Sequence, residues 1–105
     1  MRITISHGAY NHRRYSRPWI AKVTAWPVGA QPELAWGAFL GDDMGGETEI
    51  EAHPGDIIRS GQKDNRNPRK SDNNWYIVAD DGTLIDATAS TARTAWAKRN
   101  EETRA

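Results

Sequence analysis

The sequence predicts an α+β protein that is mostly β: an antiparallel sheet of five to six strands, followed by a C-terminal helix. Three observations lead to this prediction. Short segments alternate between apolar and polar residues, turns rich in glycine and proline separate them, and the periodicity becomes helical after residue 87. We expect the sheet to curl or to form a small open barrel. No repeat or linker divides the 105 residues, so residues 1–105 are expected to form a single domain.

The first predicted strands lie in the N-terminal half. Residues 2–6 alternate and predict a half-buried strand. Residues 19–26 also alternate, and their expected core face consists of Trp19, Ala21, Val23 and Ala25. Residues 34–40 form a third candidate strand, in which Gly37 indicates a bulge or a close approach of another backbone.

The clearest alternation in the chain is "ETEIEA", residues 47–52. It places three Glu side chains on one face of a strand and smaller or apolar side chains on the other. The residues that follow, "HPGD" at 53–56, match a type II turn, with Pro at its second position and Gly at its third. A short strand, "DIIRS" at 56–60, is expected next.

The C-terminal third predicts a hairpin and a helix. The segment "WYIVADDGTLIDA", residues 75–87, is typical of a hairpin with Asp81 and Gly82 at its tip. After it, Ala89, Ala92 and Trp96 share one helical stripe. Thr88 or Ser90 is the expected N-cap, and Trp96 is the expected anchor of the helix on the sheet.

Composition argues against several classes of protein. The chain has no cysteine, which excludes a disulfide framework and a thiolate metal site. The first ten residues lack the apolar segment of a secretory signal, and no apolar run approaches the roughly 20 residues of a membrane span. We therefore expect a protein of the cytoplasm that does not contact the membrane.

The net charge is zero, but the charges are segregated along the chain. Residues 1–32 carry five basic residues and no acid, residues 33–56 carry seven acids and no Lys or Arg, and residues 57–70 carry five basic residues and one acid. This pattern predicts a surface that orients a charged partner. The alternative is that sheet pairing brings the blocks together so that they neutralise each other.

Two basic segments are candidate contact regions. In "YNHRRYSRPW", residues 10–19, arginines alternate with aromatic residues, a combination that pairs with phosphates and stacks on unpaired bases. The sixteen residues 59–74 contain no large apolar side chain and are predicted to form a polar loop between two strands. The candidate nucleic-acid or partner contacts are Arg13, Arg14, Tyr15, Arg17, Arg59, Lys63, Arg66, Arg69 and Lys70.

An acidic surface is the alternative contact region. It would engage a basic groove on a protein partner. Its candidate residues are Asp42, Asp43, Glu47, Glu49 and Glu51.

No catalytic or metal site is expected. The three histidines, at positions 7, 12 and 53, do not lie in a recognisable nucleophile motif, and "DDMGGETEIE" lacks the ligand spacing of an EF-hand loop. We therefore predict no cofactor, no bound metal and no enzymatic activity. A small enzyme of unknown chemistry is the third function considered, after two kinds of binding protein.

Two segments, "HRRYSRPWIAKV" and "PGDIIRSGQKDNRNPR", resemble stretches of small accessory proteins carried by bacteriophages and other bacterial mobile elements, and the similarity extends over residues 2–86. The resemblance implies a protein that binds host machinery in the bacterial cytoplasm; some such proteins inhibit CRISPR effectors. It transfers no catalytic residue to this chain.

The leading prediction is therefore a non-enzymatic phage or mobile-element protein that docks on a host protein or nucleoprotein complex, in the manner of an anti-CRISPR inhibitor. The alternative is a module that binds RNA or single-stranded DNA directly. The sequence alone leaves open whether the basic segments meet in space, whether the acidic or the basic surface binds, and what oligomeric state the protein adopts.

Overall fold

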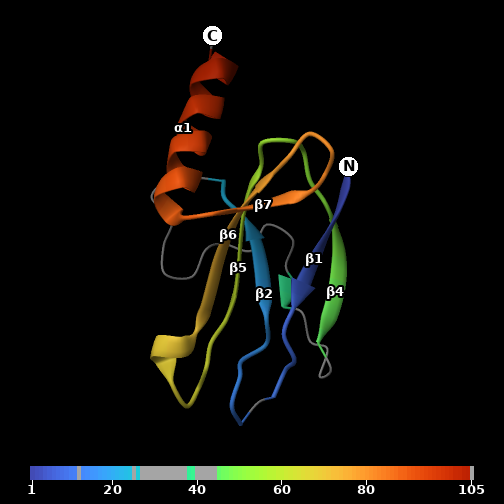
Figure 1. The fold of residues 1–105 in the computed structure, drawn as a ribbon, viewed down its shortest axis with the longest axis vertical. Helices are drawn as coiled ribbons and strands as arrows, with labels where there is room; N and C mark the ends of the chain where they lie inside the picture. Colours follow the sequence, from blue (N-terminus) through green and yellow to red (C-terminus); the bar gives the residue numbers. More distant parts are fainter. Residues whose placement is uncertain (12, 25, 27–37, 40–44, 105) are drawn as a thin grey trace.

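The structure of the protein is a computed structural model that describes residues 1–11, 13–24, 26, 38–39 and 45–104, with the backbone alone for 38–39 and 101–104. The described elements are β1 (Arg2–His7), β2 (Trp19–Lys22), β3 (Ala38–Phe39), β4 (Gly46–Glu51), β5 (Ile57–Gln62), a 3₁₀ helix (Pro68–Lys70), β6 (Asp72–Val78), β7 (Leu84–Ala87) and α1 (Ala89–Arg104) (Figure 1). The prediction of a mostly β, antiparallel α+β fold with a C-terminal helix is confirmed.

The described strands form two antiparallel sheets rather than one. Strands β3, β2, β5, β6 and β7 lie side by side in that order, and β1 pairs with β4 in a separate two-stranded sheet. Within the described residues, neither sheet closes on itself. The two-stranded sheet covers one face of the larger sheet, and α1 packs on the other face, so the molecule has three layers (Figure 1).

Two hydrophobic clusters hold these layers together. The cluster between the sheets is formed by apolar side chains from both of them: Ile3, Ile5, Ile20, Ile50, Ala52, Ile58 and Val78. The cluster under α1 contains Val23, Ile57 and Ala92, with Trp75 and Trp96 packed against them. Ile57 and Ile58 are neighbours in β5 and face opposite clusters, because successive side chains of a strand point to opposite sides.

The expected pattern of burial in β2 is wrong. The alternation of residues 19–26 placed Ile20 on the outer face, yet Ile20 and Ala21 are both 0% exposed. The reason is that β2 lies inside the five-stranded sheet, which is covered on both faces. The candidate strand 34–40 is described only as β3, and Gly37 and Ala25 lie outside the described residues.

Turns predicted from local chemistry are confirmed. Gly55 has a φ of 85°, and the Asp56 amide donates to the His53 carbonyl at 3.0 Å, which closes the turn between β4 and β5. Gly82 has a φ of 86° in the turn between β6 and β7. Both positions need the left-handed conformation that glycine adopts without strain.

The predicted sixteen-residue loop is wrong in its extent. Strand β5 continues to Gln62 and β6 begins at Asp72, so the loop between them is residues 63–71. Every residue of β5 is buried, including Gly61 and the three polar residues Arg59, Ser60 and Gln62. A run of polar residues is typical of a loop, but such residues can be buried in a strand when their side chains form hydrogen bonds.

Of the two expected N-caps of α1, Thr88 and Ser90, the structure has Thr88. The Thr88 hydroxyl accepts a hydrogen bond from the Thr91 amide at 3.1 Å, as an N-cap does. The ring centroid of Trp96 lies 5.9 Å from that of Trp26, and the centroid of Trp26 lies 5.4 Å from that of Trp75 on the sheet. Trp96 is therefore the anchor of the helix. Neither described helix combines the length and the apolar character needed to cross a membrane.

A buried carboxylate adds a polar attachment between the helix and the β4–β5 turn. Asp56 is 3% exposed. One of its oxygens accepts from Arg99 of α1 at 2.6 Å, and the other accepts from the His53 amide at 2.9 Å. The pair satisfies a charge that would otherwise be costly to bury.

Replacing Asp56 by Ala is expected to lower the free energy of unfolding by about 2–3 kcal/mol, because two hydrogen bonds to a charged group are lost. Arg99 is 41% exposed, which keeps the loss below that of a fully buried pair. Urea denaturation measures the change. Asp86→Ala, at an exposed carboxylate on β7, is the matched control and should cost less than about 0.5 kcal/mol. Equal stability of the two variants would contradict this account.

Candidate nucleic-acid interface

Two loops that are distant in sequence are joined at one end of the molecule. The β1–β2 loop (residues 8–18) and the β5–β6 loop (residues 63–71) both lie at the end opposite the C-terminus (Figure 1). The Ser16 amide donates to the Lys63 carbonyl at 2.9 Å, and the Asn65 amide donates to the Arg14 carbonyl at 2.6 Å. The Lys63 amide also donates to the Ser16 hydroxyl at 2.8 Å. The two basic segments therefore meet in space.

The side chain of Gln62 holds the base of this junction. It is buried at the end of β5, and its amide nitrogen donates to the Ala9 carbonyl at 2.6 Å and to the Ser16 carbonyl at 2.9 Å. One side chain thus binds the β1–β2 loop near both of its ends. Sequence reasoning missed this role, because nothing in the local pattern around Gln62 distinguishes it from a solvated glutamine.

Asp64 organises the β5–β6 loop from within. Its buried carboxylate accepts from the amides of Arg66 and Asn67 at 3.0 and 3.1 Å. Asn67 then caps the 3₁₀ helix by accepting from the Arg69 amide. The loop has its own hydrogen-bonded structure. The sequence "DNRNP" carries the signal for it, since Asp and Asn favour such turns and Pro favours the start of a helix.

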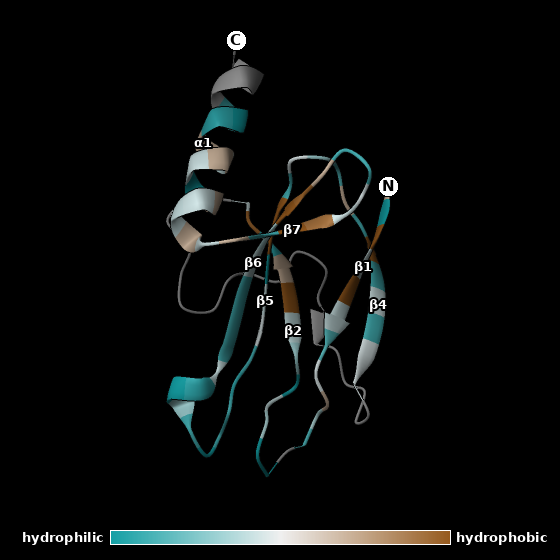
Figure 2. Ribbon diagram, in the orientation of Figure 1, coloured by the Kyte–Doolittle hydropathy of each residue, from teal (hydrophilic) through white to brown (hydrophobic). Residues whose placement is uncertain are grey.

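Seven basic side chains are exposed on the joined loops: Arg13, Arg14, Arg17, Lys63, Arg66, Arg69 and Lys70. None of them forms an ion pair with any residue that the structure describes. Asp64, the one acid in the two loops, is buried beneath them. Figure 2 shows the same end as hydrophilic, whereas the apolar residues lie in the strands above it. We call these seven side chains the basic loop surface.

Two arginines of the basic loop surface lie over tyrosine rings. The Arg14 guanidinium is 5.1 Å from the centroid of Tyr15, and that of Arg17 is 5.3 Å from the centroid of Tyr10. An arginine stacked on a ring keeps its donor edges available for a phosphate while losing less freedom on binding. Tyr15, one of the predicted contacts, is half-buried, and its backbone forms an isolated antiparallel β-bridge with that of Asp64.

Arg59, which was predicted as a contact, is placed differently. It is 8% exposed and lies on β5, with its guanidinium 4.9 Å from the Trp75 ring and 5.7 Å from the Trp19 ring. Its Nε donates to the Asn73 side-chain oxygen at 2.9 Å. Burial lowers the pKa of the Arg59 guanidinium, yet a guanidinium stays protonated at neutral pH. Arg59 therefore stabilises the sheet and does not extend the exposed basic surface.

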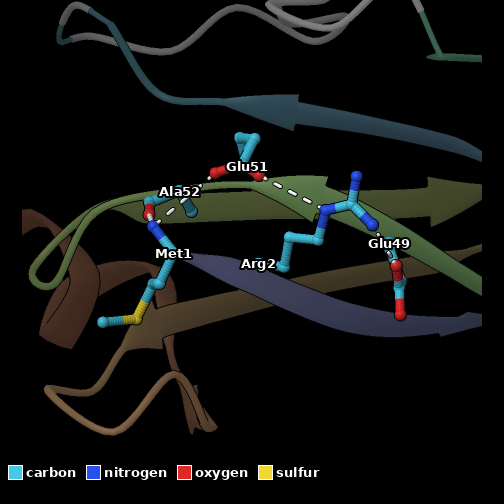
Figure 3. A network of polar contacts seen from close by, with 5 residues as sticks. All are labelled: Met1, Arg2, Glu49, Glu51 and Ala52. Atoms are coloured by element: carbon cyan, nitrogen blue, oxygen red, sulfur yellow. Dashed lines mark hydrogen bonds and ion pairs between the residues drawn. The ribbon is translucent and has the colours of Figure 1, made fainter.

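The alternative acidic surface is in part neutralised within the molecule. Glu47, Glu49 and Glu51 are exposed on β4, as predicted. Arg2 contacts Glu49 at 3.1 Å and Glu51 at 3.5 Å, and the N-terminal ammonium lies 3.6 Å from Glu51 (Figure 3). Asp42 and Asp43 lie outside the described residues. Among the described residues of the two predicted surfaces, the basic one has the larger charge without an ion-pair partner.

The histidines and acids of the described chain form no obvious reactive centre. His7 contacts the carbonyl of Gly8, and His53 is exposed at the β4–β5 turn, while His12 lies outside the described residues. Within the described part of the chain, no three His, Asp or Glu side chains are grouped so as to hold a metal ion.

Comparison of the chain with protein-family models, with curated proteins and with solved structures finds no match.

Replacing Gln62 by Glu should separate the two loops at neutral pH. The introduced carboxylate would face two carbonyl oxygens without a proton to donate, so we expect the free energy of unfolding to fall by about 2–4 kcal/mol, and by about 1–3 kcal/mol in Gln62→Ala. Amide hydrogen exchange at Ser16 and Asn65 should accelerate more than at Val23, whose amide bonds to the sheet. Lys63→Ala, at an exposed side chain, is the control; if it loosened the loops as much, Gln62 would not be the support.

Proposed function

We propose that the protein is a non-enzymatic module that binds single-stranded RNA or DNA through the basic loop surface. The observation that carries this proposal is the meeting of two basic loops, whose seven exposed cations have no anionic partner among the described residues. Like charges held together repel one another, and a chain of phosphates relieves that repulsion while releasing its counterions.

Tyrosine and asparagine side chains in the same loops favour a single strand over a duplex. Tyr10 and Tyr15 are interleaved with the arginines of the β1–β2 loop, and Asn11 and Asn65 are exposed on the first and the second loop. Unpaired bases present flat faces for aromatic contacts and edges for amide groups, whereas a duplex hides both in its stack. Hydrogen bonds between the loops also fix their separation, which reduces the entropy lost on binding.

The proposed setting is the bacterial cytoplasm, in keeping with the resemblance to accessory proteins of phages and mobile elements. There the basic loop surface would contact the nucleic acid of a host nucleoprotein complex, and an inhibitor of the anti-CRISPR type is one form of this proposal. Docking on a protein through the β4 glutamates is the competing outcome. It has less support, because two of those glutamates contact Arg2.

Binding of a fluorescently labelled 16-nucleotide oligo(dT) tests the proposal. Affinity should fall as salt rises, with a slope of roughly 0.7 per phosphate contact. The double variant Arg66→Ala, Arg69→Ala should weaken binding at low salt roughly 10- to 100-fold and reduce the slope by about 1.4.

The matched control is the double variant Arg93→Ala, Lys98→Ala, which removes the same charge from the exposed surface of α1. It should change affinity less than about 3-fold, because screening weakens charges far from the site. Absence of binding to oligo(dT) and oligo(U) at low salt would reject the proposal. Equal weakening by the two double variants would show attraction to overall charge rather than a site in the loops.

A further inference from the structure

Beside the basic loop surface, three residues on neighbouring strands form a row across the sheet. Trp19 of β2 is opposite Gly61 of β5, and Gly61 is opposite Asn73 of β6. Residues directly opposite one another share a face of the sheet. Because Gly61 and Ile57 are both on that face, the row lies on the side that carries α1, displaced from the helix toward the loops.

The absence of a side chain at Gly61 allows the Trp19 indole to cover the middle of this row. A Cβ atom at Gly61 would lie 2.6 Å from Cζ2 and 3.0 Å from Cε2 of Trp19, far inside van der Waals contact. The six-membered ring of the indole therefore occupies the space above Gly61. Trp19 is half-buried, and it belongs to neither hydrophobic cluster of the described residues.

Arg59 orients both ends of the row. Its guanidinium lies between the Trp19 and Trp75 rings, and its Nε–H donates to Oδ1 of Asn73. Because the amide oxygen of Asn73 points at Arg59, the NH₂ group of the same amide points away from Arg59. Asn73 is exposed, and that NH₂ group has no partner among the described residues. The row thus presents a half-buried aromatic ring and an exposed hydrogen-bond donor on one face of the sheet.

The row is continuous with the basic loops at both ends. Trp19 directly follows the β1–β2 loop, and Asn73 is the second residue after the β5–β6 loop. A strand of nucleic acid whose phosphates contact the loops would place its bases over the sheet next to them. Aromatic rings beside a basic track are the usual means by which single strands are bound without pairing.

Resting on the proposed function, we infer that Trp19 stacks on one base of the bound strand and that the Asn73 amide donates to a carbonyl oxygen of that base. The ligand class is a pyrimidine or guanine nucleotide within a single strand, because these bases carry an exocyclic carbonyl and adenine does not. Trp19 and Asn73 are contact residues, and Gly61 and Arg59 are positioning residues.

Two probes with the same phosphate backbone separate stacking from phosphate contact. One is a 16-nucleotide oligo(dT), and the other is an abasic oligodeoxyribose phosphate of equal length. The unmodified protein is expected to bind oligo(dT) roughly 5- to 100-fold more tightly at low salt, as expected for one stacked base. Trp19→Ala should abolish this preference, and Trp19→Phe should retain much of it. Trp96→Phe, at the helix anchor, is the control and should retain all of it.

The conservative variant Asn73→Asp preserves an acceptor for Arg59 but removes the donor. It should reduce the preference for oligo(dT) roughly 3- to 10-fold, the value of one hydrogen bond, and the abasic probe corrects for the added negative charge. If circular dichroism shows that Trp19→Ala does not fold, Asn73→Asp and Trp19→Phe test the inference in its place. The preference for oligo(dT) should then fall in Asn73→Asp and largely persist in Trp19→Phe.

Equal affinity of the unmodified protein for the two probes would overturn the inference while leaving phosphate binding by the loops intact. An equal loss on both probes in Trp19→Ala would also overturn it, since Trp19 would then only support the loops. Failure of both probes to bind would instead reject the proposed function itself.

Discussion

The side-chain amide of Gln62 is the contact on which the proposed site depends. It lies at the end of β5, buried between the β1–β2 loop and the start of the β5–β6 loop, and it satisfies two carbonyls of the first loop. Only a donor of two hydrogens fits this position, because both partners are acceptors. Strand β5 carries this amide into place, since it pairs with β2 on one side and β6 on the other.

The rest of the proposed binding surface depends on that contact. The fixed β1–β2 loop offers Ser16 as a partner for Lys63, and the buried Asp64 shapes the second loop around its own carboxylate. The seven cations of the basic loop surface lie on these two loops and form no ion pair with a described residue. Bringing these like charges together raises the electrostatic energy of the free protein, and the proposed anionic partner would relieve it. In the adjoining sheet, Arg59 contacts the Trp19 ring, and Gly61 leaves the space that this ring fills.

Much of the fold was predictable where local chemistry decides it. Alternating residues predicted β4, the Gly55 and Gly82 positions predicted two turns, and Thr88 predicted the start of α1. The end of β5 was not predictable, because Gln62 looks solvated until its distant partners are known. Likewise Ile20 seemed to face outward, since the second covering layer comes from residues far along the chain.

For the site, the residue types were predictable but their grouping was not. The arginines of the first loop and the lysines and arginines of the second were identified from composition, yet their meeting depends on hydrogen bonds between residues about 50 positions apart. Arg59 shared the same charge and run of sequence, but strand pairing turned it toward Trp75. The row formed by Trp19, Gly61 and Asn73 could not be predicted, because it spans three strands whose pairing the local sequence does not specify.

A map of backbone amide chemical shifts during titration with oligo(dT) tests whether the two joined loops bind a single strand together. The largest changes should fall in both loops together, at residues 9–17 and 63–71, and extend to Trp19 and Asn73. Changes confined to one loop, or centred on Gly46–Glu51 or on α1, would contradict the claim that the joined loops form a single binding surface.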